Sequence, residues 1–298
     1  FSSAITEFII HHYEAFLHQI AIANLLDEIK KLNPAIKLLV MTGEFYGQYS
    51  YVTGSICKKL NIPSFQLQNF ICDLVEDVDF LNCDKILFHS KKERNKFSHY
   101  FPRHLKDFKY WGNIRLNISN KLVKNISSEK LRIIYFSQPV LFDKEQKIII
   151  DYLTSLKNKI GCEICIKIHP RENLNKYDNY KQQGVDIIDG IVPITEYINN
   201  YDLAIIQTSA IGQQIILEGI PLIICQISES TRKIKLDFID NNYKGCIKNM
   251  EELSILLKDY DSLRKDFIVY RNNLIKENEW NKNIDFFNKQ IKSFLNVE

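Results

Sequence analysis

The sequence lacks the features that mark several large classes of protein. No apolar run approaches the ~20 residues that a membrane-spanning helix needs, and we recognise no signal peptide, internal repeat or low-complexity segment. The formal net charge is only +3 and evenly spread, which argues against a nucleic-acid partner. The seven cysteines are odd in number and lie mostly in apolar runs, which fits reduced thiols better than a disulfide framework. We therefore expect a cytoplasmic protein, with peripheral contact to the inner membrane left open.

What the sequence does contain is typical of a well-cored soluble protein, with 45% hydrophobic and 25% charged residues. Short apolar runs alternate with longer amphipathic stretches, a pattern that predicts parallel sheets covered by helices. Because the runs are apolar continuously, both faces of each sheet should be buried. We predict an α/β fold of two Rossmann-like parallel-sheet domains with a cleft between them. The predicted strands are Lys37–Thr42, Ser64–Gln68, Lys85–Phe88, Phe108–Trp111, Arg132–Phe136, Glu163–Ile168, Val185–Ile188, Asp202–Ile206, Leu222–Cys225 and Cys246–Lys248.

A polar stretch rich in Asn, Ser and Lys at 117–130 is the predicted domain break. It divides the chain into an N-terminal domain, 1–120, and a C-terminal domain, 121–298, which ends in helices. The first domain shows four strands and the second six, so we expect the first to lack an opening strand or to be reduced. The chain begins with Phe1 rather than Met, which suits a fragment or one part of a longer protein.

The residues that follow the strands of the second domain are the chemically informative ones, because open α/β sheets bind ligands at the carboxyl ends of their strands. Thr208 or Ser209 suits the N-cap of a helix, whose first-turn amides and dipole favour an anion. Gly212 in that turn would let a ligand or a strand approach closely. Taken alone, Thr208 and Ser209 could be an ordinary helix cap, and His169 could be a histidine whose hydrogen bonds are purely structural. The occurrence of both motifs at strand ends favours a phosphate pocket. The strand-end residues are Ser137, Gln138, His169, Pro170, Arg171, Thr208, Ser209 and Gly212.

Two segments carry a resemblance to a known family. The sequence IKIHPRE, which ends at Glu172, and the segment Thr208–Pro221 resemble the His-Pro and Ser/Thr motifs of bacterial GT-B-fold transferases. They are most similar to the capsule and lipopolysaccharide enzymes that use CMP-sialic acid or CMP-Kdo. The resemblance implies that His169, Thr208 and Ser209 contact the nucleotide phosphate. Many such enzymes carry a glutamate near the ribose or cytidine where this chain has Gln214, which can still hydrogen-bond hydroxyl groups. The implied nucleotide-sugar site consists of Ser137, Gln138, His169, Pro170, Arg171, Thr208, Ser209, Gly212 and Gln214.

The first domain resembles the same group more loosely. Thr42–Gln48 follows a strand and opens a helix, Asn61–Asn69 is similar to a strand that ends in Gln-His-Gly, and Tyr110–Asn117 is similar to a Gly-Asn-Pro-Arg linker. This domain would therefore face the acceptor.

The resemblance implies an inverting, metal-independent glycosyltransferase without a cofactor. It would move sialic acid or a Kdo-like sugar from a CMP donor onto a bacterial surface glycan or glycolipid, in capsule or lipopolysaccharide biosynthesis. Such a reaction needs a base, for which Glu44 at a strand end is our expectation, although a structural role fits Glu44 equally well. His169, Arg171 and the amides after Ser209 would offset the charge on the leaving nucleotide. The D-x-D sequence Asp77–Asp79 follows no convincing strand, so we do not expect it to bind a metal.

Three other functions share part of this pattern. A CDP-glycerol or CDP-ribitol phosphotransferase of teichoic-acid type also has a His-Pro strand end and a serine-containing anion turn. A nucleotide-sugar 2-epimerase shares the layout, but its paired acidic residues would fall at Gln213 and Gln214. A non-catalytic module that binds sugar or nucleotide in a polysaccharide-assembly complex is favoured by the Gln214 substitution, by the missing Gln-His-Gly and by the short first domain.

Overall fold

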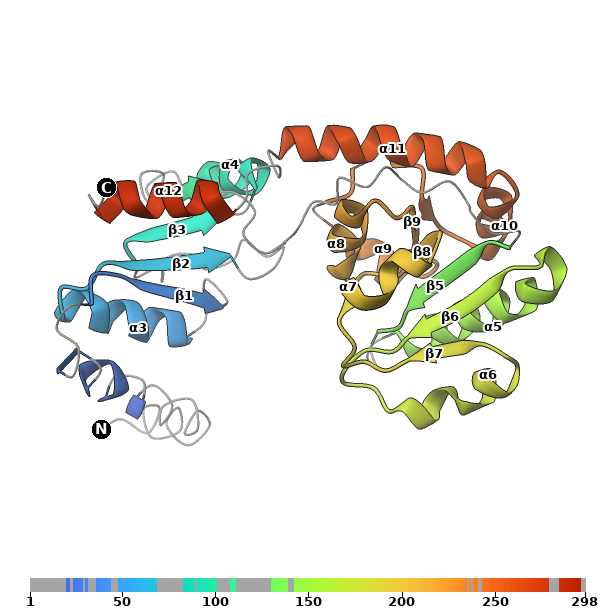
Figure 1. The fold of residues 1–298 in the computed structure, drawn as a ribbon, viewed down its shortest axis with the longest axis horizontal. Helices are drawn as coiled ribbons and strands as arrows, with labels where there is room; N and C mark the ends of the chain where they lie inside the picture. Colours follow the sequence, from blue (N-terminus) through green and yellow to red (C-terminus); the bar gives the residue numbers. More distant parts are fainter. Residues whose placement is uncertain are drawn as a thin grey trace. The chain divides into compact units, whose positions relative to one another are not determined.

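In the computed structural model the chain forms two compact units, each with its own parallel sheet (Figure 1). Unit 1 comprises Phe1–Ile114 and Glu277–Glu298, and unit 2 comprises Arg115–Lys276. The boundary in the middle of the chain falls close to the predicted break, whereas residues 277–298, which the sequence placed with the second domain, group with unit 1. The structure describes residues 20–21, 24–28, 30–31, 36–43, 48–68, 83–88, 90–100, 108–110, 130–138, 142–234, 236, 238–240, 243–278 and 284–295.

Unit 1 contains a four-stranded parallel sheet in which the strands lie side by side in chain order. Helix α12 (Ile284–Leu295) packs Phe287 and Ile291 against Phe65 and Leu87 of this sheet. This apolar contact explains why the end of the chain belongs to unit 1. The other elements are β1 (Leu39–Gly43), α3 (Gln48–Lys59), β2 (Ser64–Gln68), β3 (Lys85–Phe88), α4 (Lys91–Tyr100) and β4 (Phe108–Tyr110).

Unit 2 contains a six-stranded parallel sheet with the order β10-β9-β8-β5-β6-β7. The chain starts in the middle with β5, winds outward to β7, and then crosses back to place β8 on the other side of β5. This is the strand order of a Rossmann fold, and its topological switch lies between β5 and β8. The strands are β5 (Arg132–Phe136), β6 (Glu163–Lys167), β7 (Asp186–Ile188), β8 (Leu203–Ile206), β9 (Leu222–Cys225) and β10 (Cys246–Ile247).

Helices cover both faces of this sheet. On one face α5 (Asp143–Ile160) and α10 (Met250–Lys258) bury their apolar sides against β5, β6, β8 and β9. On the other face Tyr197 of α7 (Ile194–Tyr197) lies 6.4 Å, ring to ring, from Phe136, and α8 (Ile211–Glu218) packs on the end of β8. The remaining helices are α6 (Asp178–Gln182), α9 (Glu229–Lys233), α11 (Tyr260–Glu277) and the 3₁₀ turns Leu174–Tyr177 and Ile198–Asn200.

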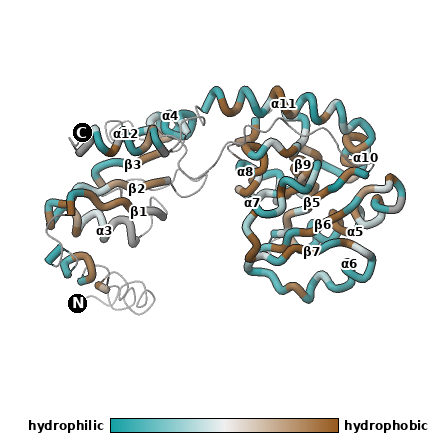
Figure 2. The backbone as a smooth tube through the Cα atoms, in the orientation of Figure 1, coloured by the Kyte–Doolittle hydropathy of each residue, from teal (hydrophilic) through white to brown (hydrophobic). Residues whose placement is uncertain are grey.

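The sequence pattern accounts for the buried sheet and for the helices that cover it. Every residue of β8 and β9 is buried, and the central strands of unit 2 are hydrophobic in Figure 2, where α11 alternates between the two colours. Helix α5 buries Ile149 and Leu153 while Ile148 stays half exposed, and it ends at Gly161 with φ of 65°. Burial of each large aliphatic side chain contributes roughly 1.5–3 kcal/mol, so the strand-rich core holds the strand ends in fixed positions. Within the described residues, no helix is long and apolar enough to cross a membrane.

Candidate functional site

The residues predicted after β5, β6 and β8 do lie together, because β5 sits between the other two strands. The His169 amide donates to Ser137 Oγ over 2.8 Å. On the other side of β5, the Thr208 amide and hydroxyl both donate to Gln138 Oε1, over 3.2 and 2.9 Å. Since Ser137 and Gln138 are consecutive, one chain of bonds joins the His-Pro segment to the segment that precedes α8. The switch point of the sheet thus gathers three of the predicted segments.

A hydrogen bond to the imidazole of His169 determines which ring nitrogen carries the proton. Its Nδ1 accepts a hydrogen bond from the Arg171 amide over 3.1 Å, so in the neutral ring the proton sits on Nε2. Burial lowers the pKa of His169, and Arg171 and Lys167 lower it further, while the Glu172 carboxylate opposes them. In its neutral form the ring therefore carries an N–H group at Nε2.

The His-Pro segment packs against the loop that follows β7. A Cβ added at Gly190 would lie 2.6 Å from Pro170 Cα and 2.9 Å from the His169 carbonyl carbon, so only glycine fits there. Lys167, the last residue of β6, is buried, and its ammonium donates to the Asp189 carbonyl. Burial lowers the pKa of Lys167. This lysine and Gly190 together clamp the β7 loop against the segment that carries His169.

The start of α8 differs from the prediction in two respects. The N-cap residue is Ala210 rather than Thr208 or Ser209, and it makes no side-chain cap. The first-turn amides are not free, because those of Ile211 and Gly212 donate to Ser209 Oγ and to the Ser209 carbonyl, over 3.3 and 3.2 Å. The prediction was wrong because the helix opens with a tight turn that uses these donors internally. In this segment, the amides of Ser209 and Ala210 donate to no other described residue.

Packing explains the glycine in this turn. A Cβ at Gly212 would lie 2.6 Å from Ile206 Cδ1 and 2.7 Å from Phe238 Cζ, so the close approach is made by side chains and brings α8 onto β8. Gln214 is half-buried and Gln213 is buried. Gly212 therefore serves the site by placing the helix.

The far end of α8 is fixed by a buried arginine. Arg271 of α11 donates from Nε to the Ile216 carbonyl over 2.8 Å and from Nη2 to the Leu217 carbonyl over 2.7 Å. Both carbonyls belong to the last turn of α8, where a helix leaves carbonyls without their usual donors, and the Ile216 carbonyl also accepts from the Gly219 amide over 3.0 Å. Gly219 follows in the left-handed conformation, with φ of 83°. Helix α8 is thus held at both ends, which keeps Thr208–Ala210 in place.

The carboxylate that organises the site stands in the predicted His-Pro motif, but the sequence analysis assigned it no role. Glu172, three residues after His169, accepts hydrogen bonds from Ser137 Oγ, Tyr177 and Gln146. Its inward orientation was not predicted, because a glutamate in a polar loop is usually solvated and nothing local indicates that it turns inward. A short His-Pro-x-Glu spacing was the only available signal.

Several predicted residues lie outside the described part of the chain. They include Glu44, Asp77–Asp79, Asn69 and the linker 117–129. Their roles stay predictions. Among the residues that the structure does describe, no group of three or more His, Cys, Asp and Glu side chains is placed to hold a metal ion.

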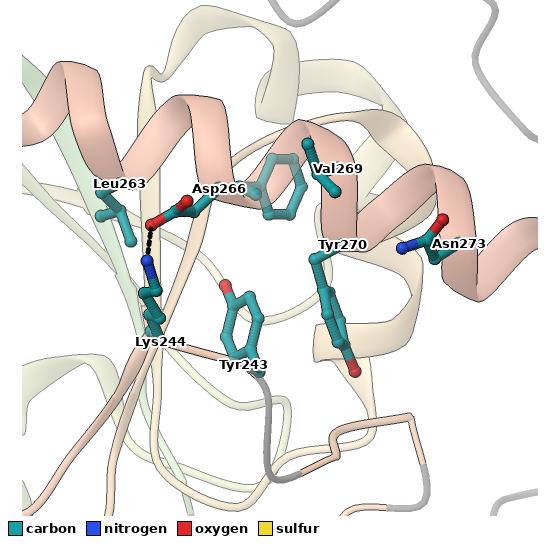
Figure 3. Close-up of a pocket in the computed structure, with 9 residues that line it drawn as sticks. Tyr243, Lys244, Leu263, Asp266, Val269, Tyr270 and Asn273 are labelled. Carbon is teal, nitrogen blue, oxygen red and sulfur yellow. Dashed lines mark hydrogen bonds and ion pairs between the residues drawn. The ribbon is translucent and has the colours of Figure 1, made fainter.

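Another hollow of unit 2 lies away from these strand ends (Figure 3). It has a volume of about 190 Å³ between α11 and the segment 243–245, and a 2.7 Å ion pair between Lys244 and Asp266 lies at its edge. The hydroxyl of Tyr243 donates to the carbonyl of Leu222, the first residue of β9. The hollow is therefore at the amino ends of the strands, and none of the predicted site residues lines it.

Comparison with known proteins bears on the fold. Neither a search of protein-family models nor a search of curated proteins finds a match. Among solved structures, Staphylococcus aureus MnaA with UDP superposes with a TM-score of 0.61 and 12% identity, over 94% of this chain and 81% of that one. The fold is GT-B-like. The lipopolysaccharide outer core galactosyltransferase WaaB gives a TM-score of 0.53 and 12% identity over 95% and 81% of the two chains.

A third similar structure is longer than this chain. The accessory secretory protein 1, 2 and 3 structure from Streptococcus pneumoniae gives a TM-score of 0.55 and 14% identity, and the match covers 92% of this chain but only 56% of that one. The chain thus spans little more than half the length of this relative. At these identities the similarity concerns the fold alone, and the predicted arrangement of two Rossmann-like parallel-sheet domains is confirmed.

Proposed function

We propose that this protein is a glycosyltransferase of the GT-B type that uses a nucleotide-sugar donor and a bacterial surface glycan as acceptor. The observation that carries the proposal is the hydrogen-bonded chain from His169 through Ser137 and Gln138 to Thr208. It brings the two motifs that resemble sugar transferases to one place, the switch point of the sheet, where α/β folds bind nucleotides.

The donors available there suit a phosphate group. His169 offers its Nε2 proton, the amides of Ser209 and Ala210 are unused within the described residues, and Arg171 is exposed with its guanidinium free of any described partner. Arginine pairs well with phosphate oxygens because its planar group donates two parallel hydrogen bonds. As the bond between sugar and phosphate breaks, these groups would offset the negative charge that develops on the nucleotide.

The finer identity of the donor rests on the motif resemblance. We favour a CMP-activated sialic acid or Kdo-like sugar, an inverting reaction without metal or cofactor, and Glu44 as the base. Gln214, on the exposed side of α8 relative to the buried Gln213, is the proposed contact to the ribose or cytidine. A cytoplasmic location with peripheral contact to the inner membrane would bring such an enzyme to a glycolipid acceptor.

The first experiment measures nucleotide binding. Thermal unfolding of the full chain would be followed with CMP, CDP, UDP and GDP, because a ligand at a hundredfold excess over its Kd stabilises the folded state by roughly 2.7 kcal/mol. We expect CMP to raise Tm the most. The largest shift with CDP would favour the polyol phosphotransferase, and no shift with any nucleotide would contradict the proposal.

A matched pair of variants then separates a local site from general charge. Arg171→Ala and Lys181→Ala each remove one exposed positive charge, but only Arg171 lies in the His-Pro segment. We expect Arg171→Ala to weaken nucleotide binding about tenfold, the size of one charge-assisted hydrogen bond, and Lys181→Ala to leave it unchanged. Equal effects of the two variants would remove Arg171 from the site.

Transfer assays test the reaction itself. Incubation with CMP-sialic acid or CMP-Kdo and bacterial glycan acceptors should release CMP, and Glu44→Gln should abolish release while it preserves CMP binding. Full transfer by Glu44→Gln would exclude Glu44 as the base. Binding without transfer to any acceptor would favour the non-catalytic module.

A further inference from the structure

The most connected polar side chain among the described residues of unit 2 is Glu172, a residue that the proposed reaction does not use. Its side chain is only 3% exposed. Five donors converge on its carboxylate from three parts of the fold: the end of β5, helix α5 and the segment 169–177. They are Ser137 Oγ, Gln146 Nε2, the His169 amide, Lys176 Nζ and the Tyr177 hydroxyl.

The two carboxylate oxygens face different neighbours. Oε2 accepts from Ser137 Oγ and, at 3.3 Å, from the His169 amide, so it bonds the residues at the strand ends. Oε1 accepts from Gln146 at 3.1 Å and from Lys176 and Tyr177, each at 2.9 Å. The carboxylate therefore ties the strand ends to the helical layer behind them.

Gln146 closes the network. Its side-chain oxygen accepts from the Gln138 amide over 2.7 Å, and its amide nitrogen donates to Tyr177 as well as to Glu172. Both residues that follow β5 are thus bonded to this network, one through its hydroxyl and one through its backbone. Movement of Glu172 would release Ser137, Gln138 and His169 together.

A carboxylate is needed here rather than an amide. All five groups around Glu172 are donors, and an ionised carboxylate only accepts. A glutamine would turn its own N–H groups toward at least one of these donors and leave buried polar groups unpaired. Burial alone would raise the pKa of Glu172, but the bonds from Ser137, Lys176, Gln146 and Tyr177 outweigh it and hold the pKa below its usual value.

The charge of Glu172 acts on His169 as well. It raises the pKa of His169 against burial, Arg171 and Lys167, which all lower it. Lys176, which also pairs with Asp143 over 2.7 Å, partly balances the carboxylate on the far side. Among the described residues, these are the charged groups that face Glu172 and His169.

We propose that Glu172 is the positioning residue of this anion site: its buried carboxylate fixes the backbone of His169 and the side chain of Ser137. The proposal rests on the proposed function for the identity of the anion. The orientation of the imidazole, however, can be measured without any ligand.

The experiment compares Glu172→Gln, Glu172→Asp and, as a control, Glu196→Gln on the exposed face of α7. NMR of the ligand-free chain, with ¹⁵N-labelled histidine and the His169 signal assigned from its loss in His169→Asn, reports the imidazole pKa and which ring nitrogen carries the proton. Calorimetry reports affinity for CMP, with inorganic phosphate as a second probe.

In the wild type and in Glu196→Gln we expect the proton on Nε2. In Glu172→Gln we expect a mixture of the two neutral forms, a lower pKa of His169, and affinity at least about tenfold weaker. Glu172→Asp keeps the charge but is one carbon shorter, so the pKa of His169 should stay closer to wild type while affinity still falls.

An unchanged proton position, pKa and affinity in Glu172→Gln would overturn the proposal. Weaker binding with a wild-type imidazole would overturn it too, because that is the result of a purely structural role. If Glu172→Gln does not fold, Glu172→Asp and Tyr177→Phe, which loses one donor to Oε1, decide by the same readings. If the wild type binds neither CMP nor phosphate, the proposed function fails, while the imidazole measurements still decide the role of Glu172.

Discussion

Substitution of Gly190 by alanine should damage the site without removing any of its chemical groups. The added Cβ would lie 2.6 and 2.8 Å from Pro170 Cα and N and 2.9 Å from the His169 carbonyl carbon. Carbon atoms pack at about 3.5–4.0 Å, so the His-Pro segment would have to retreat by about 1 Å. All three contacts are with backbone, and a side-chain rotation cannot relieve them.

Two magnitudes follow from this displacement. Overpacking of this kind costs about 1–3 kcal/mol of stability, which urea denaturation measures. A shift of about 1 Å in a binding or catalytic group can cost about a hundredfold in rate, and we expect nucleotide affinity, measured by calorimetry, to fall by at least about tenfold.

A second glycine provides the matched control. Gly161, at the end of α5, has φ of 65° and no atom within 4 Å of an added Cβ. Gly161→Ala should cost about 1–2 kcal/mol through its left-handed conformation alone, and it should leave affinity unchanged. If Gly190→Ala loses similar stability but binds nucleotide like the wild type, then the position of the His-Pro segment does not matter for binding and the reasoning fails.

Three further predictions address other parts of the site. Arg271→Met should lower the free energy of unfolding by about 1–3 kcal/mol, measured in urea, because the Leu217 carbonyl loses the arginine donor and the Ile216 carbonyl keeps only the Gly219 amide; no measurable change would contradict this. Thr208→Val should weaken nucleotide binding about tenfold in calorimetry through loss of the bond to Gln138, with a stability change of at most about 1.5 kcal/mol, and normal affinity would remove the hydroxyl from the site. Burial lowers the pKa of His169, so the unfolded chain binds a proton at this histidine more readily than the folded chain does. The free energy of unfolding should therefore fall as the pH drops below about 6.5. Urea titrations from pH 7.5 to 5 should show a smaller fall in His169→Asn than in the wild type, and parallel curves would refute the lowered pKa.

Much of the second unit could be predicted from the sequence, because short continuous apolar runs such as Leu222–Cys225 are typical of strands buried on both faces. The placement of the segments that carry His169 and Thr208 at one edge of the sheet also followed, since parallel strands share one carboxyl edge. The N-cap at Ala210 could not be predicted, because two hydroxyl residues beside it fit the usual preference and the choice depends on how tightly the first turn winds.

The orientation of Glu172 and the packing of the C-terminal helix could not be predicted from the sequence for another reason. Periodicity shows that 284–295 is amphipathic, but it does not say that Phe287 meets Phe65 rather than a residue of the other sheet. In the same way, the inward turn of Glu172 depends on donors from α5 and from the end of β5, which are distant in sequence. Both are long-range contacts that no local pattern carries.

The position of Arg271 determines how far the chain can be shortened when unit 2 is prepared alone. Its bonds reach the Ile216 and Leu217 carbonyls, so a version that stops after β10 would keep every strand and every predicted ligand-binding residue of that half. It would nevertheless lack the side chain that completes the last turn of α8. An isolated unit 2 therefore has to include Arg271, and the compact unit itself ends at Lys276.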